Sequence, residues 1–327
     1  MGPPASAQPC YHPQMIFLRR LLALVLFIAL VGAARAQDAC PPPVGMPTQA
    51  QLQAAQKLAK DRGFLWRITK EGRSSYLYGT IHIAKLDWVF PGPEMRKALS
   101  ETDSLALELN LLDPGTLSQL TQGVQQSPPT PLPPALQERL ARQAQASCVP
   151  IDQLTPLRPE FQIITLTVMA LRKDGLEAAY GIDMVLAGMA QSGKKPIRSL
   201  ETAAGQLALL QASDTTEALA TVDEGLRLLE DGSAQLLMAK LANAWAASDH
   251  ASLGNYPDWC NCANTPKDQA QMRRLTDERH PVMAQQIDTL HQQGGRVFAA
   301  VGALHMFGPQ GLPALMAKLG YAVEKVF

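Results

Sequence analysis

The sequence of 327 residues contains two copies of the motif Gly-x-x-His, each directly after an apolar run. The first copy, in YLYGTIH, ends at His82, and the second, in VGALH, ends at His305. A glycine that ends a strand lets the backbone turn sharply, so we expect Gly79 and Gly302 to deliver both histidines to one sheet edge, where open α/β sheets form their sites. Two imidazoles at one edge could share a metal ion. Either histidine alone would more often be a hydrogen-bonded core or loop residue.

Three carboxylates lie where they could complete such a site. Glu108 interrupts the apolar run 104–109, and a buried carboxylate needs a partner charge or a metal ion. Glu201 directly follows the expected strand 196–200, and Asp183 lies at the start of an expected helix. Either of these two could instead serve only the positive end of a helix dipole.

Arg279 and His280 lie in the stretch DERH, within a segment whose pattern predicts one long helix. The local sequence favours a solvated charged face for Arg279. Its role is therefore left open by the residues around it.

Together these motifs resemble the TraB/GumN group, which includes the Tiki metalloproteases and PrgY-type proteins. The resemblance runs from about residue 64 to 327 and is carried by LYGTIHIAKLDWVFP, LALELN, GIDMVLAGMAQSGKKPIRSLETAAGQ, DERH and VFAAVGALHMFGPQGLPALMAKLGYAVEKV. It implies a metal-dependent hydrolase fold. By position, His82 and His305 match the family's histidines, and the matching acidic and polar positions are Glu108, Glu201, Asp183 and Arg279. The family usually has Glu-Arg-Asn where this chain has Glu-Arg-His, which could add His280 as a third imidazole near the site.

The residues and the resemblance agree on a hydrolase hypothesis. Imidazoles with carboxylates suit Mn²⁺, Co²⁺ or Zn²⁺, held by His82, His305 and Glu201. Such an ion lowers the pKa of bound water and polarises a carbonyl. Glu108 would act as general base, and Arg279 would stabilise the oxyanion. The expected substrate is a peptide or a small molecule.

Two alternatives remain. The same pocket could bind a small ligand, haem or a peptide without catalysis. The GumN label suggests an accessory factor in polysaccharide production, but an aromatic content of 6% offers no cluster for stacking sugars. The formal net charge is zero, with no run of basic residues, which argues against a nucleic-acid partner. The oligomeric state is left undetermined.

Residues 15–40 have the layout of a secretory signal peptide, with a basic pair, an apolar run and Ala34-Arg35-Ala36 before an expected cut at Gln37. The apolar run is shorter than a spanning helix needs, so we expect no stable membrane anchor after cleavage. This predicts a periplasmic or secreted protein. Translation could start at Met1 or at Met15.

Four cysteines follow the expected cleavage site, and in an exported chain they predict disulfides. Cys260 and Cys262 are too closely spaced to bridge comfortably with each other. We therefore expect cross-pairing to Cys40 and Cys148.

The predicted fold class is α/β, with a mixed central sheet from the N- and C-terminal segments and a large helical middle region in a single domain. Residues 1–36 form an N-terminal extension and the signal peptide, 37–60 a Pro-rich lead-in with a short helix, and 61–327 the folded domain, with a helical insertion at about 134–293. Expected strands are 64–68, 75–78, 105–109, 196–200, 296–301 and 321–327. Expected helical segments are 51–60, 161–173 (buried), 181–191, 203–212, 218–245, 268–293 and 312–319, and 126–134 is expected to be a loop.

Overall fold

The computed structural model describes residues 40–41, 44–125 and 130–327. The predicted extension and signal peptide, residues 1–36, therefore lie outside the described residues, as do residues 126–129 of the Pro-rich loop predicted at 126–134. Within the described part, no helix is both long enough and apolar enough to cross a membrane.

A six-stranded mixed sheet forms the centre of the fold, in the order β4-β3-β5-β2-β1-β6. Strands β2 to β5 run parallel, whereas β1 is antiparallel to both of its neighbours, β2 and β6. The sheet combines N- and C-terminal segments around a helical middle, which confirms the predicted fold class. The strands are β1 Phe64–Lys70, β2 Arg73–Thr80, β3 Ser104–Leu107, β4 Ile197–Ser199, β5 Val297–Gly302 and β6 Ala322–Lys325.

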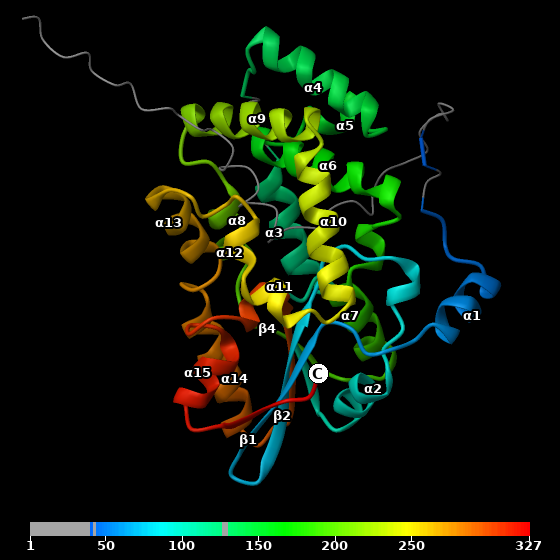
Figure 1. Ribbon diagram of the computed structural model, residues 1–327, viewed down its shortest axis with the longest axis vertical. Coiled ribbons are helices and arrows are strands. Elements are labelled where there is room, and N and C mark those ends of the chain that lie inside the picture. The colour runs from blue at the N-terminus through cyan, green and yellow to red at the C-terminus, as the bar shows by residue number, and fades with distance from the viewer. Residues whose placement is uncertain (1–39, 42–43, 126–129) are drawn as a thin grey trace, which may run out of the picture.

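Helices cover both faces of the sheet (Figure 1). On one face, α14 (His280–Gln292) packs against β5, and α15 (Leu312–Lys318) packs against β1 and β6. On the other face, α7 (Ile182–Ser192) packs against β3 and β4. Strand β5 is buried along Val297–Val301, because both of its faces are covered.

A block of helices stands beyond the carboxyl ends of the parallel strands (Figure 1). Its centre is α6 (Pro159–Ala170), of which only Thr165 is not fully buried, as predicted for the apolar segment 161–173. The sheet's carboxyl edge therefore faces this block. The remaining helices are α1 Gln49–Lys57, η3 Leu86–Trp88, α2 Pro93–Ser100, α3 Pro114–Val124, α4 Pro134–Ala146, α5 Ile151–Leu154, η4 Leu171–Asp174, η5 Ala178–Tyr180, α8 Ala203–Leu210, α9 Thr215–Glu230, α10 Ser233–Ala246, α11 His250–Gly254, α12 Tyr256–Trp259, α13 Pro266–Leu275 and η6 Ala303–Met306.

Two segments predicted as continuous helices are each broken in two. The segment 218–245 divides into α9 and α10 at Gly232, whose φ of +75° is left-handed and interrupts a right-handed helix. The segment 268–293 divides into α13 and α14 around Thr276, which leaves helical backbone geometry, and Pro281 then occupies the first turn of α14. As a result, Arg279 is the N-cap of a new helix and is not in the middle of an old one.

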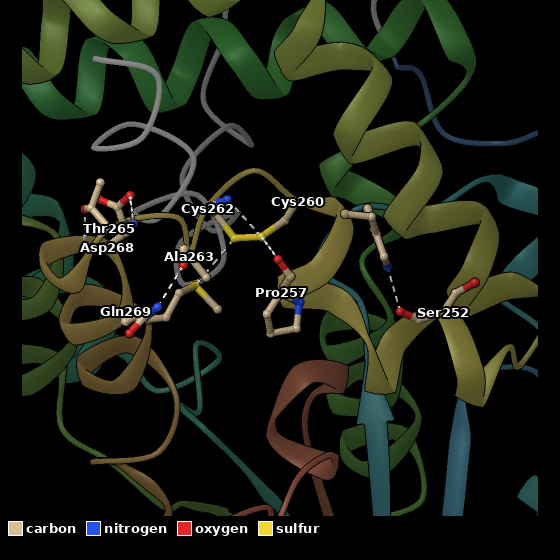
Figure 2. The surroundings of a disulfide bond; sticks show 10 residues. Ser252, Pro257, Cys260, Cys262, Ala263, Thr265, Asp268 and Gln269 are labelled. Carbon is tan, nitrogen blue, oxygen red and sulfur yellow. Dashed lines mark hydrogen bonds between the residues drawn. A yellow bond between two sulfur atoms is a disulfide. The ribbon is translucent and has the colours of Figure 1, made fainter. Parts of the chain in front are cut away.

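The predicted cross-pairing of cysteines was wrong. The disulfides join Cys40 to Cys148 and Cys260 to Cys262 (Figure 2 shows the latter). The close pair is accommodated because Asn261 between the two cysteines has φ +52°, a left-handed conformation that asparagine tolerates. Its Cα atoms are 5.1 Å apart, within the ordinary range for a disulfide. The other bond ties the lead-in segment to the residues that follow α4.

Candidate functional site

The two Gly-x-x-His motifs lie side by side because β2 and β5 are adjacent parallel strands. In their register, Gly79 pairs with Val301 and Thr80 pairs with Gly302. Parallel strands end at the same edge of a sheet, so both motifs leave the sheet at its carboxyl edge. His82 lies two residues after the end of β2, and His305 lies in η6 directly after β5.

Neighbouring atoms leave little room for a side chain at either turn glycine. A Cβ on Gly79 would lie 3.0 Å from the Cα of Ala303, so a side chain there would press on the turn of the second motif. A Cβ on Gly302 would lie 3.3 Å from Glu108 Oε1, 3.6 Å from His305 Cδ2 and 3.8 Å from His82 Nε2. One carboxylate and both imidazoles therefore converge beside Gly302.

His82 is oriented by Asp183 in the first turn of α7. Its Nδ1 lies 2.7 Å from Asp183 Oδ2, and because a carboxylate accepts, Nδ1 carries the proton of this hydrogen bond. The start of α7 is seated on the first motif, since the backbone N–H of Ile182 donates to the carbonyl of Ile81, and a Cβ on Gly181 would lie 2.5 Å from the His82 carbonyl oxygen. The Nε2 atom of His82 is buried and has no hydrogen-bond partner among the described residues.

The charge of Asp183 decides the protonation of His82. Burial alone would lower the pKa of the imidazole, but the adjacent Asp183 carboxylate outweighs burial and raises the pKa of His82 to about 9. Without a bound cation, His82 is therefore protonated at neutral pH.

Arg279 binds both glutamates of the cluster. Its Nη2 lies 2.5 Å from Glu108 Oε2 and also donates to Glu201 Oε2, while its Nε donates to Glu201 Oε1 at 2.9 Å. Burial alone would raise the pKa of the Glu108 carboxyl, but Arg279, the two histidines and the Gly302 N–H together hold that pKa well below its usual range. Glu108 is thus ionised throughout the neutral range.

All five N–H groups of Arg279 are engaged. Besides the three bonds to the glutamates, Nη1 donates to the carbonyl of Leu275 at 3.0 Å and faces His305 Nε2 at 3.1 Å. A guanidinium has five N–H donors, so this one has no donor left for a ligand.

Gln206 is a member of the cluster that the sequence interpretation missed. Its Nε2 lies 3.0 Å from both Glu108 Oε2 and Glu201 Oε2, and only 2% of the residue is exposed. A polar residue in the otherwise apolar helix AAGQLALL, five positions after Glu201, is the signal that could have identified it.

His280 lies behind His305. Its Nε2 is 2.7 Å from His305 Nδ1, and its Nδ1 is 2.8 Å from the backbone carbonyl oxygen of Gln310. Burial lowers the pKa of His280, and burial together with the nearby Arg279 guanidinium holds the pKa of His305 well below its usual value. Both rings are therefore neutral near pH 7.

All the predicted site residues thus lie in one cluster at the carboxyl edge of the sheet. Two groups of side chains differ in exposure. Those of His82, Asp183 and Glu201 are 13, 15 and 12% exposed. Those of Arg279, Glu108 and His305 are 7, 8 and 6% exposed. The side of the cluster that solvent reaches therefore lies at His82 and Glu201.

The donor chemistry of the cluster suits a divalent cation. In the described part of the chain, no group of three or more His, Cys, Asp or Glu side chains is already arranged around a common metal position. The buried Nε2 of His82 nevertheless has no hydrogen-bond partner among the described residues, and it becomes a metal ligand once it gives up its proton. Among the same residues, Glu108 Oε1 accepts a hydrogen bond from the Gly302 N–H alone, at 2.7 Å. These two atoms with His305 Nε2 form an imidazole and carboxylate set suited to Mn²⁺, Co²⁺ or Zn²⁺. To join it, His305 has to release Arg279.

A pocket with about 310 Å³ of empty space, part of it open to solvent, lies among the described residues, and no side chain of the cluster lines it. Ile182 and Tyr78, the neighbours of Asp183 and Gly79, belong to its wall. The rest of the wall is mainly apolar and includes Trp88, Phe90 and Met189.

Comparison with known proteins gives a consistent set of matches. The sequence model of the TraB/PrgY/gumN family matches residues 64–325. The chain is 28% identical to the uncharacterized protein YbaP of Escherichia coli (strain K12) and to that of Shigella flexneri, over 75% of this chain and 88% of each relative. It is 26% identical to metalloprotease TIKI1 of Danio rerio, over 80% of this chain and 62% of that protein. No solved structure shows a significant match.

Proposed function

Since this chain belongs to the TraB/PrgY/gumN family, we propose that it is a metal-dependent hydrolase and that its substrate is a peptide. The observation that carries the proposal is the convergence of His82, His305 and Glu108 beside Gly302, with the buried Nε2 of His82 left without a hydrogen-bond partner among the described residues. The similarity to a relative named as a metalloprotease supports the same reaction class.

In this proposal His82, His305 and Glu108 hold the ion. A bound divalent cation would polarise a peptide carbonyl and make a nearby water more acidic. Asp183 orients the His82 ring through Nδ1, so that its Nε2 is presented to the cation. Glu201 lies close by, but both of its oxygens are bound by Arg279.

Glu108 serves as a ligand of the ion through Oε1 in this proposal, because Arg279 and Gln206 bind its other oxygen, Oε2. Its Oε1 faces the same point as the histidines, and its carboxylate stays ionised because Arg279 holds its pKa low. A carboxylate with so low a pKa is a weak general base near neutral pH, so Glu108 is assigned to holding the ion and not to the predicted role of general base. Arg279, with every N–H engaged, is assigned to holding the two glutamates in place rather than to contacting an oxyanion.

The test is the metal content of the purified protein after incubation with Mn²⁺, Co²⁺ or Zn²⁺, followed by removal of free ion. We expect about one ion per chain, and loss of that ion in both His82→Ala and His305→Ala. His291→Ala is the matched control, because His291 is also buried but contacts Ser75 and Lys70, away from the cluster. Peptide-library cleavage should require the same two histidines. The proposal would be contradicted if the wild-type protein bound no ion. It would also be contradicted if the two histidine variants cleaved peptides as fast as the wild type.

The ion pairs of Arg279 with Glu108 and Glu201 favour one alternative function, that of a binding protein without catalysis. A guanidinium that neutralises two buried carboxylates can stabilise a fixed binding site without any metal. Glu108→Ala separates the two functions, since it should abolish turnover by a hydrolase but leave ligand binding intact.

We also propose that the protein works in the periplasm or outside the cell. The basic pair, apolar run and small-residue cleavage site in residues 15–36 support this location. Cell fractionation together with N-terminal sequencing of the mature protein tests it, with Gln37 as the expected first residue.

A further inference from the structure

A line of hydrogen bonds runs from Arg279 through two imidazoles to a backbone carbonyl. Arg279 Nη1 is 3.1 Å from His305 Nε2, His305 Nδ1 is 2.7 Å from His280 Nε2, and His280 Nδ1 is 2.8 Å from the oxygen of Gln310. The two rings meet edge to face, with centroids 4.9 Å apart. Each of the four ring nitrogens therefore has one partner in this line.

The two ends of the line determine where every proton lies. A guanidinium only donates, so His305 Nε2 must accept, and in a neutral imidazole the proton then lies on Nδ1. A carbonyl oxygen only accepts, so the proton of His280 lies on Nδ1 and its Nε2 is an acceptor. Both ends thus require His305 Nδ1–H to donate to His280 Nε2. The lowered pKa values of both histidines agree with neutral rings.

We infer that His280 is a positioning residue that locks His305 in one tautomer, with the proton on Nδ1 and the Nε2 lone pair facing the cluster. The tautomer follows from the hydrogen bonds alone. The use of that lone pair as a metal ligand rests on the function proposed above. His280 is therefore not a third ligand, because its Nδ1 is turned away to Gln310 and its Nε2 is occupied by His305.

This role resembles that of the residues which orient metal ligands in other proteins. A ligating histidine usually donates its second N–H to an acceptor, which fixes the ring and its tautomer. For His82 the acceptor is the Asp183 carboxylate, and for His305 it is the imidazole of His280.

The test uses the full chain labelled with ¹⁵N and long-range ¹H–¹⁵N spectra of its histidines, recorded without metal. We expect His305 to show a protonated Nδ1 and an unprotonated Nε2 near pH 7. In His280→Leu the Nδ1–H of His305 has no acceptor. We therefore expect His305 to show a mixture of tautomers and faster exchange of this proton. His280→Gln should restore the wild-type spectrum, because the glutamine Oε1 can reach the position of the histidine Nε2.

A second measurement separates positioning from folding. His291→Leu removes another buried histidine of the same helix, and it should leave the His305 signals unchanged. Metal affinity should fall about 10- to 100-fold in His280→Leu and recover in His280→Gln. A wild-type His305 with its proton on Nε2, or a His280→Leu spectrum identical to wild type, would overturn the inference. If the wild type binds no metal, the proposed function fails, and the spectra still decide the tautomer.

Discussion

Arg279 Nη2 lies 2.5 Å from Glu108 Oε2 in an ion pair whose two side chains are 7 and 8% exposed. The pair joins the N-cap of α14 to the residue directly after β3, two elements that are far apart in the sequence. Glu201 shares the same guanidinium. One cation therefore balances two carboxylates in a nearly closed space, and the stability of the cluster depends on it.

Replacing Arg279 by methionine should strongly destabilise the fold. The substitution keeps apolar volume but leaves Glu108 and Glu201 without their cation, and breaking a buried ion pair costs about 3–5 kcal/mol. Urea unfolding at pH 7 measures this loss. Glu324→Gln is the control, since Glu324 pairs with Arg67 at the surface and should contribute less than about 1 kcal/mol. A similar small loss in both variants would show that the buried pair contributes little.

Stability of the metal-free protein should fall as the pH rises from about 6.5 to about 9. His82 has a pKa of about 9 in the folded protein and about 6.5 when unfolded. A group whose pKa is raised by folding contributes its full stabilisation at pH values below its pKa in the unfolded chain. This contribution is lost as the pH rises through its pKa in the folded protein. The loss is about 3 kcal/mol. Urea unfolding in the presence of a chelator, at pH 6, 7.5 and 9, measures it.

Asp183→Asn is the control for this pH dependence. The amide keeps the size of the side chain but removes the charge that raises the pKa of His82. The decline between pH 6.5 and 9 should therefore flatten in this variant. A steep decline that persists in Asp183→Asn would assign the effect to a different group.

Gly302→Ala should impair the cluster with little effect on the fold. The new methyl group would lie 3.3 Å from Glu108 Oε1 and 3.8 Å from His82 Nε2, where the proposed cation has to sit. Metal content and peptide cleavage should both fall, while the urea midpoint changes little. Gly188→Ala on α7 is the matched control, because its Cβ meets open space, and it should stabilise the helix by up to about 1 kcal/mol. Full metal binding by Gly302→Ala would place the cation elsewhere.

Gln206→Glu should destabilise the protein at neutral pH and less so in acid. A third carboxylate would replace the amide that now donates to both glutamates, whereas the cations Arg279 and protonated His82 are already paired with Glu108, Glu201 and Asp183. Like charges in one site raise the pKa of one of them, so a shared proton should relieve the repulsion as the pH falls. Unfolding at pH 5 and pH 7.5 compares the two conditions. Gln206→Met, which loses the donor but adds no charge, should show a weaker pH dependence.

Much of the candidate site could be predicted because its signals are local. A strand followed by glycine and histidine is a short pattern, and so is a carboxylate within an apolar strand or directly after one. The prediction of a mixed sheet from both ends of the chain was confirmed for the same reason, since the apolar runs and glycines that bound each strand are contiguous.

The sequence by itself determined which residues stand at strand ends and helix starts, because backbone turns and apolar periodicity depend on neighbours in the chain. Only the tertiary structure decided which of them meet. The parallel register of β2 and β5 brings His82 to His305, and the helix break at Thr276 turns Arg279 inward to the glutamates. The position of His280 behind His305 and the pairing of Cys260 with Cys262 likewise depend on packing and on single backbone angles. These contacts join segments distant in sequence or rest on a conformation that residue type permits but does not impose.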